Sequence, residues 1–417
     1  MKPLPDGWRQ VTIGQVADTA LGKMLDRQHQ RGMPAVPYLR NVNVQWGRID
    51  TTDISTMELS DDERERFAVE PGDLLACEGG EIGRAAIWHG STEYIAFQKA
   101  LHRIRSRGSI NLTFLRYLLQ LYSWNGTLRR FATGSTIAHL PQQQLRSLPV
   151  PLPPLAEQAR IVDVLEDQIS RLDGAKGYLD SLTPRLTSLP TATLLRDEAV
   201  SAAERRPLRS ILADPLTNGR SVPTREGGFP VLRLTALGNG TIDLSQRKGG
   251  AWAEDEARPF LVQRGDFLVS RGNGSLHLVG RGGLVRDQPD GVAYPDTLIR
   301  VYFDESIVDR NYMSAVWNSP IVREQIERMA RTTAGIYKVN QKHVESVELP
   351  LPSLNEQERV SARIEEAQGI AYRLQSAARV AESRAATLRQ ALLAAAFSGR
   401  LTRRSSETVL GEELPNA

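Results

Sequence analysis

The sequence lacks a long apolar run: no stretch of about 18 or more apolar residues occurs in it, although a membrane-spanning helix needs that length. Its start, Met-Lys-Pro-Leu-Pro-Asp-Gly-Trp, has no apolar segment of the kind found in signal peptides. Cysteine is nearly absent, since Cys77 is the only one and cannot form an internal disulfide. These absences predict a soluble protein of the reducing cytoplasm.

Motifs of common active sites are also missing. The histidines are scattered, with no H-E-x-x-H motif and no His/Cys cluster suited to zinc. No Glu-x-Lys occurs, which removes a usual signature of magnesium-dependent nucleases, and Gly22-Lys23-Met24 lacks the spacing and the Ser/Thr of a P-loop. Asn318-Ser319-Pro320-Ile321 superficially resembles an amino-methyltransferase motif, but Ser319 before Pro320 favours a helix start. We therefore expect no catalytic residue, no metal site and a chain that is not an enzyme by itself.

The overall composition is that of a globular protein, with 41% hydrophobic and 24% charged residues. A length of 417 residues exceeds that of one typical domain. The net charge is only +3, although the isoelectric point is near 9.0. Any surface that attracts nucleic acid must therefore be local.

One stretch occurs twice. Pro151–Gln158 reads Pro-Leu-Pro-Pro-Leu-Ala-Glu-Gln, Pro350–Gln357 reads Pro-Leu-Pro-Ser-Leu-Asn-Glu-Gln, and helix-forming residues follow each. From Val360 to Ala395, apolar or small residues recur at alternating spacings of four and three, which is typical of a coiled-coil seam. The first copy keeps the same phase. The sequence thus predicts two long helices that pack on each other; two ordinary core helices are the simpler alternative.

Large residues of the first predicted helix match small residues of the second, so the two seams are expected to interlock. The predicted helix-pairing residues are Leu165, Leu172, Leu179, Leu186, Ile364, Ala371, Ala378 and Ala385. Pro184 and Pro190 lie inside the first helix. An interior proline removes a hydrogen bond and costs about 3 kcal/mol, so we expect a kink or a break there.

The segments that precede the two helices also match, in the same order. Pro37-Tyr-Leu-Arg matches Pro230-Val-Leu-Arg, Gly72-Asp-Leu-Leu matches Gly265-Asp-Phe-Leu, and Leu101-His-Arg matches Leu298-Ile-Arg. The separation begins at 193, grows to 197 and reaches 199 at the Glu-Gln pair. Such drift indicates insertions in the loops of a duplicated fold. The expected segments are a first unit, 1–154, a helix, 155–201, a second unit, 202–353, a second helix, 354–401, and a polar tail, 402–417.

The glycine-rich loops Gly79–Arg84 and Gly272–Arg281 are the most suggestive loop features. Backbone N–H groups exposed by glycine, with arginines alongside, suit close approach to phosphate, and nearby amides and cations could read base edges. Tight turns with solvated charges explain any single residue equally well. The DNA-binding candidates are Lys23, Arg40, Gly79, Gly80, Arg84, Gln98, Lys99, Arg103, Ser135, Thr136, Arg220, Arg233, Arg271, Asn273, Arg281, Arg300 and Lys338.

Two divergent units, each ending in the proline run with Glu-Gln and followed by a long helix, resemble the specificity subunit of type I restriction-modification systems. The closing run Ala394–Leu401, the Trp8 start, Gly22–Leu25, Gly134–Ile137 and the Pro-Gly-Asp-Leu-Leu turn are similar to segments of that family. The second unit departs from the pattern. It has Thr333-Ala334-Gly335-Ile336 in place of Gly-Ser-Thr-Ile, and its entry near Arg206-Pro207-Leu208 lacks the tryptophan.

The resemblance implies an α+β protein with two tandem target-recognition domains, each with a β-rich core, and two long helices that pair as an antiparallel coiled coil with pseudo-twofold symmetry. Each domain would read one half of a bipartite double-stranded DNA target. The helices would set the gap and dock two modification subunits, which methylate adenine. S-adenosylmethionine, ATP and Mg²⁺ are expected only on partner subunits, restriction subunits included. A coiled-coil adaptor that binds no DNA and a duplicated enzyme active in the glycine loops are the alternatives.

Overall fold

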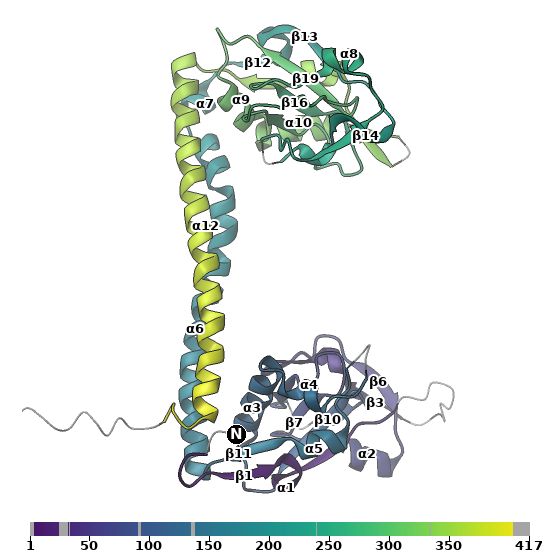
Figure 1. Cartoon of the computed structure of the whole chain (residues 1–417), viewed down its shortest axis with the longest axis vertical. Helices are drawn as coiled ribbons and strands as arrows, with labels where there is room; N and C mark the ends of the chain where they lie inside the picture. Colours follow the sequence, from purple (N-terminus) through teal and green to yellow (C-terminus); the bar gives the residue numbers. More distant parts are fainter. Residues whose placement is uncertain are drawn as a thin grey trace, which may run out of the picture. The chain divides into compact units, whose positions relative to one another are not determined.

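The computed structural model describes residues 4–402 apart from 25–31, 33, 91–92, 135–137, 239 and 334. Within these residues the chain forms two compact units: unit 1 holds Met1–Tyr178 and Arg379–Ala417, and unit 2 holds Leu179–Ala378. Each unit therefore contains one folded domain and a part of each of two long helices (Figure 1). None of the helices in the described part of the chain has both the length and the apolarity needed to cross a membrane.

Unit 1 is built around an antiparallel four-stranded sheet. Its strands, in spatial order, are β2 (Ala17–Leu21), β10 (Leu101–Ser106), β7 (Leu74–Cys77) and β8 (Ala85–Ile87). Strand β7 is buried on both faces. Leu74 packs in a cluster with Phe114 of helix α3 (Leu112–Trp124), whereas Leu75 packs with Phe97 on the other face. The Asn111 side chain caps α3, because it accepts hydrogen bonds from the N–H groups of Thr113 and Phe114.

A second sheet and short elements complete the first domain. The sheet contains β6 (Ser55–Glu58), β3 (Ala35–Leu39) and β9 (Ala96–Phe97). Strand β3 ends at Leu39 because the Asn43 side chain accepts the Arg40 N–H (2.8 Å) and folds the next residues into a 3-10 turn. The other elements are β1 (Arg9–Thr12), α1 (Ile13–Val16), η1 (Asn41–Asn43), β4 (Val44–Gln45), β5 (Arg48–Ile49), α2 (Asp61–Phe67), α4 (Thr127–Phe131), α5 (Gln142–Ser147) and β11 (Pro149–Leu152).

Unit 2 repeats the central sheet of unit 1. Its strands are β13 (Leu212–Asn218), β19 (Leu298–Phe303), β16 (Phe267–Ser270) and β18 (Gly282–Leu284), in the same spatial order and again antiparallel. The Gly22 N–H donates to the Leu101 carbonyl at 3.2 Å, and the Gly219 N–H donates to the Leu298 carbonyl at 3.2 Å. The duplication predicted from the sequence is therefore confirmed at the level of strand order and individual hydrogen bonds.

Further elements of unit 2 surround this sheet. The helix start predicted at Pro320 is confirmed, although the Ser319 hydroxyl donates to the Val316 carbonyl (2.7 Å) and does not cap the helix. The elements are α7 (Glu198–Ala202), β12 (Arg205–Pro207), η2 (Leu208–Ile211), β14 (Thr224–Leu232), η3 (Leu234–Ala236), β15 (Arg247–Gly250), α8 (Glu254–Ala257), η4 (Arg258–Phe260), β17 (Gly272–Asn273), α9 (Arg310–Trp317), α10 (Pro320–Met329), β20 (Arg331–Thr333), β21 (Ile336–Lys338), α11 (Gln341–Glu345) and β22 (Glu348–Pro350).

The long helices α6 (Leu155–Leu195) and α12 (Leu354–Phe397) lie side by side, as predicted (Figure 1). In unit 1, Glu157 contacts Thr402 and Asp173 pairs with Arg389. In unit 2, Thr187 contacts Gln375 and Asp197 pairs with Arg363. Later residues of α6 thus meet earlier residues of α12 in both units, which is an antiparallel arrangement.

Helix α6 is not broken at Pro184 or Pro190, so a break was predicted wrongly. The hydroxyl of Thr183 donates to the Leu179 carbonyl (3.3 Å), and that of Thr187 donates to the Thr183 carbonyl (2.9 Å). These bonds do not replace the missing donors, because the carbonyls that face Pro184 and Pro190 are those of Asp180 and Leu186. Because a proline removes only its own N–H from the ladder, the packing along α12 is sufficient to keep α6 helical.

The interlock of large and small seam residues stays a prediction. Leu172 belongs to unit 1, and its matched residue Ala371 belongs to unit 2. Leu165 is buried in the core of unit 1, and Ile364 is buried in the core of unit 2. The seam residues that are only half-buried are Leu172, Leu179, Leu186, Ala378 and Ala385, while Ala371 is buried.

A buried glutamine joins each helix to its domain. The Gln158 side chain accepts the Asn111 N–H (2.7 Å) and donates to the carbonyls of Ser109 (3.1 Å) and Pro153 (2.9 Å). Gln357 repeats this pattern: it accepts one backbone N–H and donates to two backbone carbonyls, in bonds of 3.0, 2.9 and 2.9 Å with Asp309, Ile307 and Pro352. The repeated Glu-Gln pair of the sequence is thus a structural joint, which fixes the direction in which each helix leaves its domain.

Candidate nucleic-acid interface

In each unit a glycine allows two segments to approach closely. A Cβ on Gly22 would overlap the carbonyl of Gln98, and one on Gly219 would overlap that of Pro295. Behind Gly22, Lys23 forms a β-bridge with Gln98, and the Lys99 N–H donates to the Lys23 carbonyl (2.9 Å). The structure therefore brings the candidate Lys23 next to the candidates Gln98 and Lys99, which lie far from it in the sequence.

These neighbours differ in what their side chains do. The Lys23 ammonium forms an ion pair with Glu63 of α2, and this hydrogen bond lowers the pKa of the Glu63 carboxyl. Lys99 is exposed, and its ammonium makes no hydrogen bond or ion pair with a described residue. Lys99 is therefore available to an external anion, whereas Lys23 is largely used by the fold.

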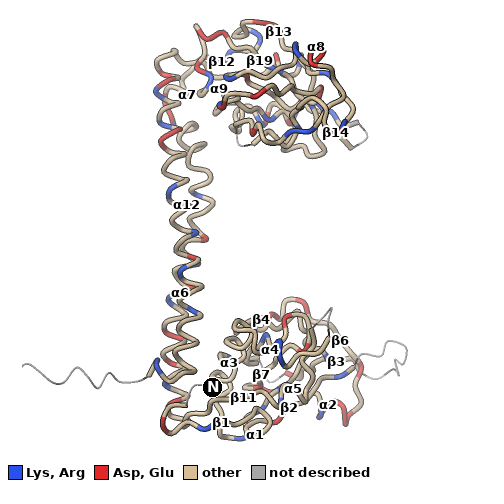
Figure 2. Tube along the Cα trace, viewed as in Figure 1, with Lys and Arg blue, Asp and Glu red and all other residues tan. Residues whose placement is uncertain are grey.

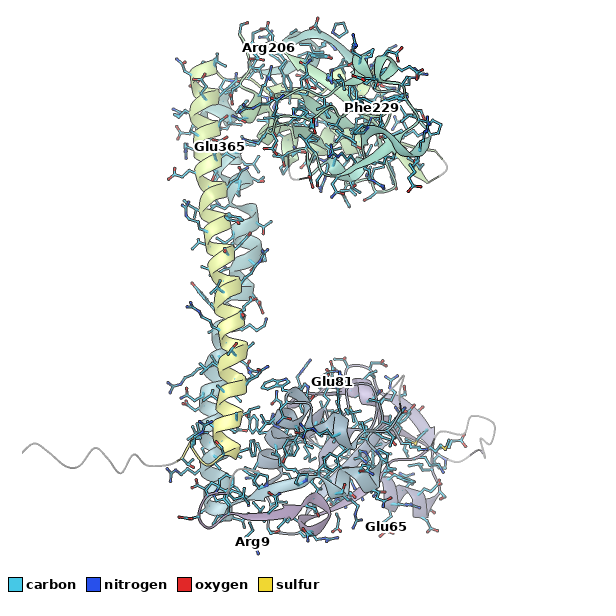
Figure 3. The ribbon with its side chains drawn as sticks, in the orientation of Figure 1. Arg9, Glu65, Glu81, Arg206, Phe229 and Glu365 are labelled. Carbon is cyan, nitrogen blue, oxygen red and sulfur yellow. The ribbon has the colours of Figure 1, made fainter. Side chains whose placement is uncertain are left out.

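The glycine loop of unit 1 is held by its own charged residues. The Arg84 guanidinium donates to the Asn41 carbonyl (2.8 Å) and pairs with Glu81 (3.3 Å), and Glu81, labelled in Figure 3, also accepts the Trp46 indole N–H (2.6 Å). Gly79 is buried against His139, and Gly80 is exposed with a φ of +73°. Arg84 thus supports the loop. The candidates Ser135 and Thr136 lie outside the described residues.

Unit 2 gathers its candidates on a small sheet formed by β17, β21 and β20. Gly272 and Asn273 pair with Lys338 and Tyr337, and the Asn273 side chain accepts the Ser275 N–H (3.0 Å). The Arg281 guanidinium donates to the His277 carbonyl (3.0 Å), which ties it to the same loop. The sheet therefore places Arg271, Asn273 and Lys338 together.

Two matched arginines face the interior, so the structure does not support their prediction as DNA contacts. Arg300 is buried; it pairs with Asp266 (3.0 Å), donates to the Tyr302 hydroxyl (3.0 Å) and lies over the Tyr294 ring. Burial raises the pKa of the Asp266 carboxyl, and the Arg300 charge opposes that rise. Arg103 donates to backbone carbonyls before and after the end of α2. Both strands are covered on two faces, so alternation of residue types did not reveal the direction of these side chains.

Three other candidates support loops at the surface. Arg40 pairs with Asp53 (2.7 Å) and also donates to its carbonyl (2.8 Å). Arg220 is exposed and pairs with Glu256 (3.5 Å), and Arg233 is exposed and donates to the Arg247 carbonyl (3.2 Å). Arg220 and Arg233 combine a local structural bond with exposure, and Arg40 combines one with partial exposure, so all three remain candidates.

Exposed apolar residues near the glycine loops were missed in the sequence. Met24 and Val42 are 67% and 54% exposed in unit 1, and Ile336 and Leu278 are 45% and 39% exposed in unit 2. Exposed large apolar residues beside cations are typical of binding surfaces. Met24, Leu278 and Ile336 lie within segments that the sequence analysis had singled out, and Val42 lies two residues after the candidate Arg40. This proximity is the only signal that pointed to them.

Charge alone does not mark a single element as the interface. Figure 2 shows cations and anions interspersed along α6 and α12 and over both domains. Asp173 with Arg389 is one such pair between the helices. The candidate surfaces are therefore defined by which cations remain without a partner, and not by the number of cations.

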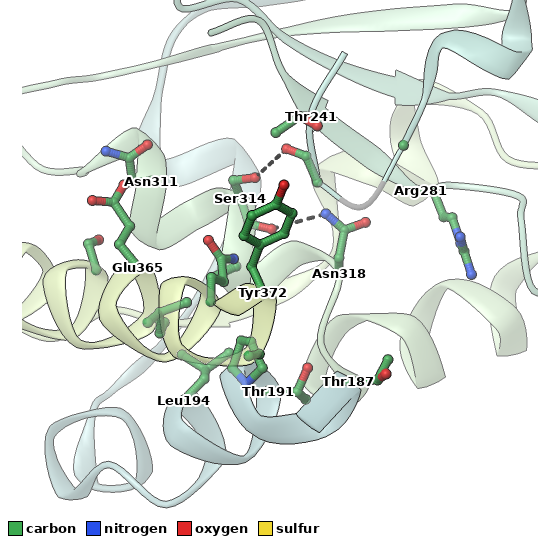
Figure 4. Close-up of a pocket in the computed structure, with 18 of the residues that line it drawn as sticks. Thr187, Thr191, Leu194, Thr241, Arg281, Asn311, Ser314, Asn318, Glu365 and Tyr372 are labelled. Carbon is green, nitrogen blue, oxygen red and sulfur yellow. Dashed lines mark hydrogen bonds between the residues drawn. The ribbon is translucent and has the colours of Figure 1, made fainter. Parts of the chain in front are cut away.

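Unit 2 also contains a cavity of about 850 Å³ between its domain and its helix segments (Figure 4). Two of its polar side chains are already used: the Ser314 hydroxyl donates to the Gly240 carbonyl (2.8 Å), and the Asn318 amide donates to the carbonyls of Gly282 (2.9 Å) and Ser314 (3.0 Å). Asn318 is thus a structural residue, not part of a methyltransferase motif. Among the described residues, no group of three or more His, Cys, Asp and Glu is arranged to hold a metal ion.

Comparisons with known proteins give one consistent family. Residues 5–182 match the type I restriction modification DNA specificity domain. The chain is 26% identical to the specificity subunit of the type I restriction enzyme EcoKI from Escherichia coli K12, over 96% of this chain and 90% of that one. It is 23% identical to the StySPI specificity subunit of Salmonella potsdam, over the same shares. The solved HsdS subunit of Thermoanaerobacter tengcongensis, 18% identical, has the same fold with a TM-score of 0.61, over 95% of this chain and 98% of that one.

Proposed function

Residues 5–182 belong to the type I restriction modification DNA specificity domain family, and from this premise we propose that the chain is the DNA sequence-recognition subunit of a type I restriction-modification complex. Each of its two domains reads one half of a bipartite double-stranded DNA target. The chain itself is not catalytic. The complex acts in the cytoplasm, where the chromosome and entering foreign DNA are both accessible.

The observation that carries this proposal is a repeated scaffold with different exposed residues. The hydrogen bond of Gly22 with Leu101 recurs as that of Gly219 with Leu298. The residues next to these glycines are Lys23 and Met24 in unit 1 but Arg220 and Ser221 in unit 2. Two copies of one scaffold with different surfaces suit the reading of two different half-sites, because base contacts specify sequence whereas the scaffold only positions them.

The helices have a separate role in the proposal. Helices α6 and α12 contain 41 and 44 residues, which corresponds to about 60–65 Å at 1.5 Å per residue. They set the number of base pairs between the two half-sites and dock two modification subunits. Those subunits bind S-adenosylmethionine and methylate adenine, and restriction subunits use ATP and Mg²⁺. This chain binds none of these cofactors.

Single-molecule sequencing of DNA from cells that express this chain with its modification subunit tests the proposal. We expect methylated adenine at a split motif with a fixed gap, and none when this chain is omitted. A stable complex with the modification subunit that leaves DNA unmethylated, and that binds duplex without salt dependence, would favour the coiled-coil adaptor instead. Turnover by the isolated chain would favour the duplicated enzyme.

A further inference from the structure

The small sheet of unit 2 has two different faces. Its strand order is β17, β21, β20, and both pairings are antiparallel, with Arg331 opposite Lys338 and Gly272 opposite Lys338. Residues directly opposite each other share one face of a sheet. Tyr337 lies between Ile336 and Lys338 on β21, so its side chain is on the opposite face, where it packs against the core of unit 2. The other face, which carries Gly272, Arg331, Ile336 and Lys338 and is here called the cationic face, therefore points to solvent.

The cationic face holds two like charges in direct opposition. Arg331 and Lys338 are both exposed, and neither side chain forms a hydrogen bond or an ion pair with any described residue. Like charges directly opposite each other destabilise a sheet. Most arginines near the candidate loops have a carboxylate or carbonyl partner, as Arg220 does with Glu256. An arrangement that costs stability within the chain suits an anionic partner outside it.

The shape of this face suits a flat or convex partner. At Gly272, an added Cβ would lie 3.5 Å from Lys338 Cγ and 3.7 Å from Ile336 Cγ2, so any larger side chain would stand between these residues. The glycine leaves a shallow floor beside Ile336, which is 45% exposed. Cations next to an exposed aliphatic side chain match a duplex, where phosphates flank a groove that displays thymine methyl groups.

The corresponding place in unit 1 lacks this charge. There Gly79 and Thr133 each form a β-bridge with His139. Gly79 corresponds to Gly272, Thr133 to Arg331 and His139 to Lys338, which pair in the same way in unit 2. Threonine and histidine thus replace the arginine and the lysine. The scaffold of three adjacent segments is common to both units, and the cation pair belongs to unit 2 alone. A requirement of the shared fold would place the charges in both units, so the difference indicates a role in binding.

We propose that the cationic face of unit 2 binds the DNA duplex, with Arg331 and Lys338 on phosphates and Ile336 against the apolar edge of a thymine in one half-site. This inference rests on the proposed function and deepens it. The two phosphate contacts explain why the like charges are tolerated. Ile336 supplies sequence preference, because a thymine methyl in the major groove is recognised by apolar contact.

The first test uses the full chain assembled with its modification subunits, and the duplex that the complex methylates. For the double variant Arg331→Ala and Lys338→Ala, we expect the slope of log K against log salt concentration to fall by about two, since each phosphate contact contributes about 0.9. The unfolding midpoint should stay constant or rise, because a repulsion is removed. The matched control, Arg209→Ala with Lys342→Ala, removes two exposed cations elsewhere in unit 2 and should leave the slope unchanged.

The second test substitutes Ile336→Ala and maps methylated sites by sequencing. We expect the preference at one base pair of one half-site to relax about fivefold or more, with the other half-site unaffected, since a lost base contact costs about 1–3 kcal/mol. An unchanged salt slope in the double variant would overturn the inference, as would an unchanged site preference in Ile336→Ala. A wild-type complex that methylates no split site would instead overturn the proposed function.

Discussion

Gly22 and Gly219 occupy the same place in the two units and make the same 3.2 Å hydrogen bond, yet the residues around them have diverged. The glutamines at the start of the long helices are also the same in both units. Gln158 and Gln357 each bind two backbone carbonyls and one backbone N–H. The candidate DNA-binding surfaces, in contrast, differ between the two units. Unit 1 exposes Met24 where unit 2 has Ser221, and unit 2 carries a cation pair that unit 1 lacks.

The buried ion pairs of the two units are partly retained and partly changed. Asp73 of unit 1 accepts the Glu70 N–H (2.8 Å), and Asp266 of unit 2 accepts the Gln263 N–H (2.7 Å), so both carboxylates close the same turn. Asp73 pairs with Arg105 (2.6 Å), whereas Asp266 pairs with Arg300, which matches Arg103 and not Arg105. The side chains that bind the backbone were thus retained in both copies, whereas their charged partners could move along the strand.

The largest expected effect comes from breaking a joint. Gln158→Ala leaves two carbonyls and one N–H buried without partners, and each such group costs about 1–3 kcal/mol. We expect several kcal/mol of destabilisation, with hydrogen exchange rising mainly in unit 1. Gln357→Ala should do the same in unit 2. Gln375→Ala, which removes one half-exposed hydrogen bond of 3.3 Å, is the control and should change little. Equal exchange in both units after either joint substitution would contradict two separate joints.

The next effect comes from the close approach at the shared glycines. Gly22→Ala and Gly219→Ala each place a methyl group against a backbone carbonyl that cannot rotate away. Overpacking of this kind costs about 3 kcal/mol, and the two losses should be similar in denaturant titrations. Gly174→Ala in α6 meets nothing within 4 Å and should stabilise the helix by about 0.5–1 kcal/mol. A tolerated alanine in one unit only would show that the matched glycines are not equivalent.

A smaller difference between the units should appear with pH. His102 of β10 is buried, donates to the Leu140 carbonyl (2.7 Å) and matches Ile299 of unit 2. Burial lowers the pKa of His102 from 6.5 to about 4. The unfolded chain therefore binds more protons in this range, and stability present above pH 6.5 is lost as the pH falls, by about 2 kcal/mol at pH 5.

His102→Ile, which installs the residue of unit 2, removes this dependence. Thermal unfolding of both forms between pH 5 and pH 8, followed by hydrogen exchange in each unit, measures the effect. If the wild type and the variant lose stability in parallel as the pH falls, His102 is not the source.

The smallest effect should distinguish two ion pairs of the helices. Asp173 and Arg389 form a largely exposed pair in unit 1, for which about 0–1 kcal/mol is typical. In unit 2, Asp197 is buried, caps α7 through the Ala199 N–H (3.0 Å) and pairs with Arg363. Asp197→Ala should therefore cost about 1 kcal/mol more than Asp173→Ala in urea unfolding. Equal costs would show that the buried cap adds nothing.

The repeat was readable from the sequence because it preserves backbone-binding residues. The Glu-Gln pairs were recognisable from residue type and spacing. The register of α6 against α12 was not, since a seam with spacings of four and three is compatible with several antiparallel alignments. The burial of Arg300 was hidden because its strand is covered on both faces. The sequence marked the segment that contains Ile336 but not the exposure of its side chain, because the exposure of a single aliphatic residue depends on how a short sheet is oriented.

The most direct test of the proposal that the helices set the spacing adds one heptad to both α6 and α12. The quantity measured is the number of base pairs between the two methylated half-sites. Seven residues lengthen a helix by about 10 Å, close to three base pairs at 3.4 Å each. Sequencing of methylated DNA should show both half-site sequences unchanged and a gap that is about three base pairs longer. An unchanged gap, or altered half-sites with the original gap, would contradict a division of labour in which two diverged domains read the sequence and the paired helices set the spacing.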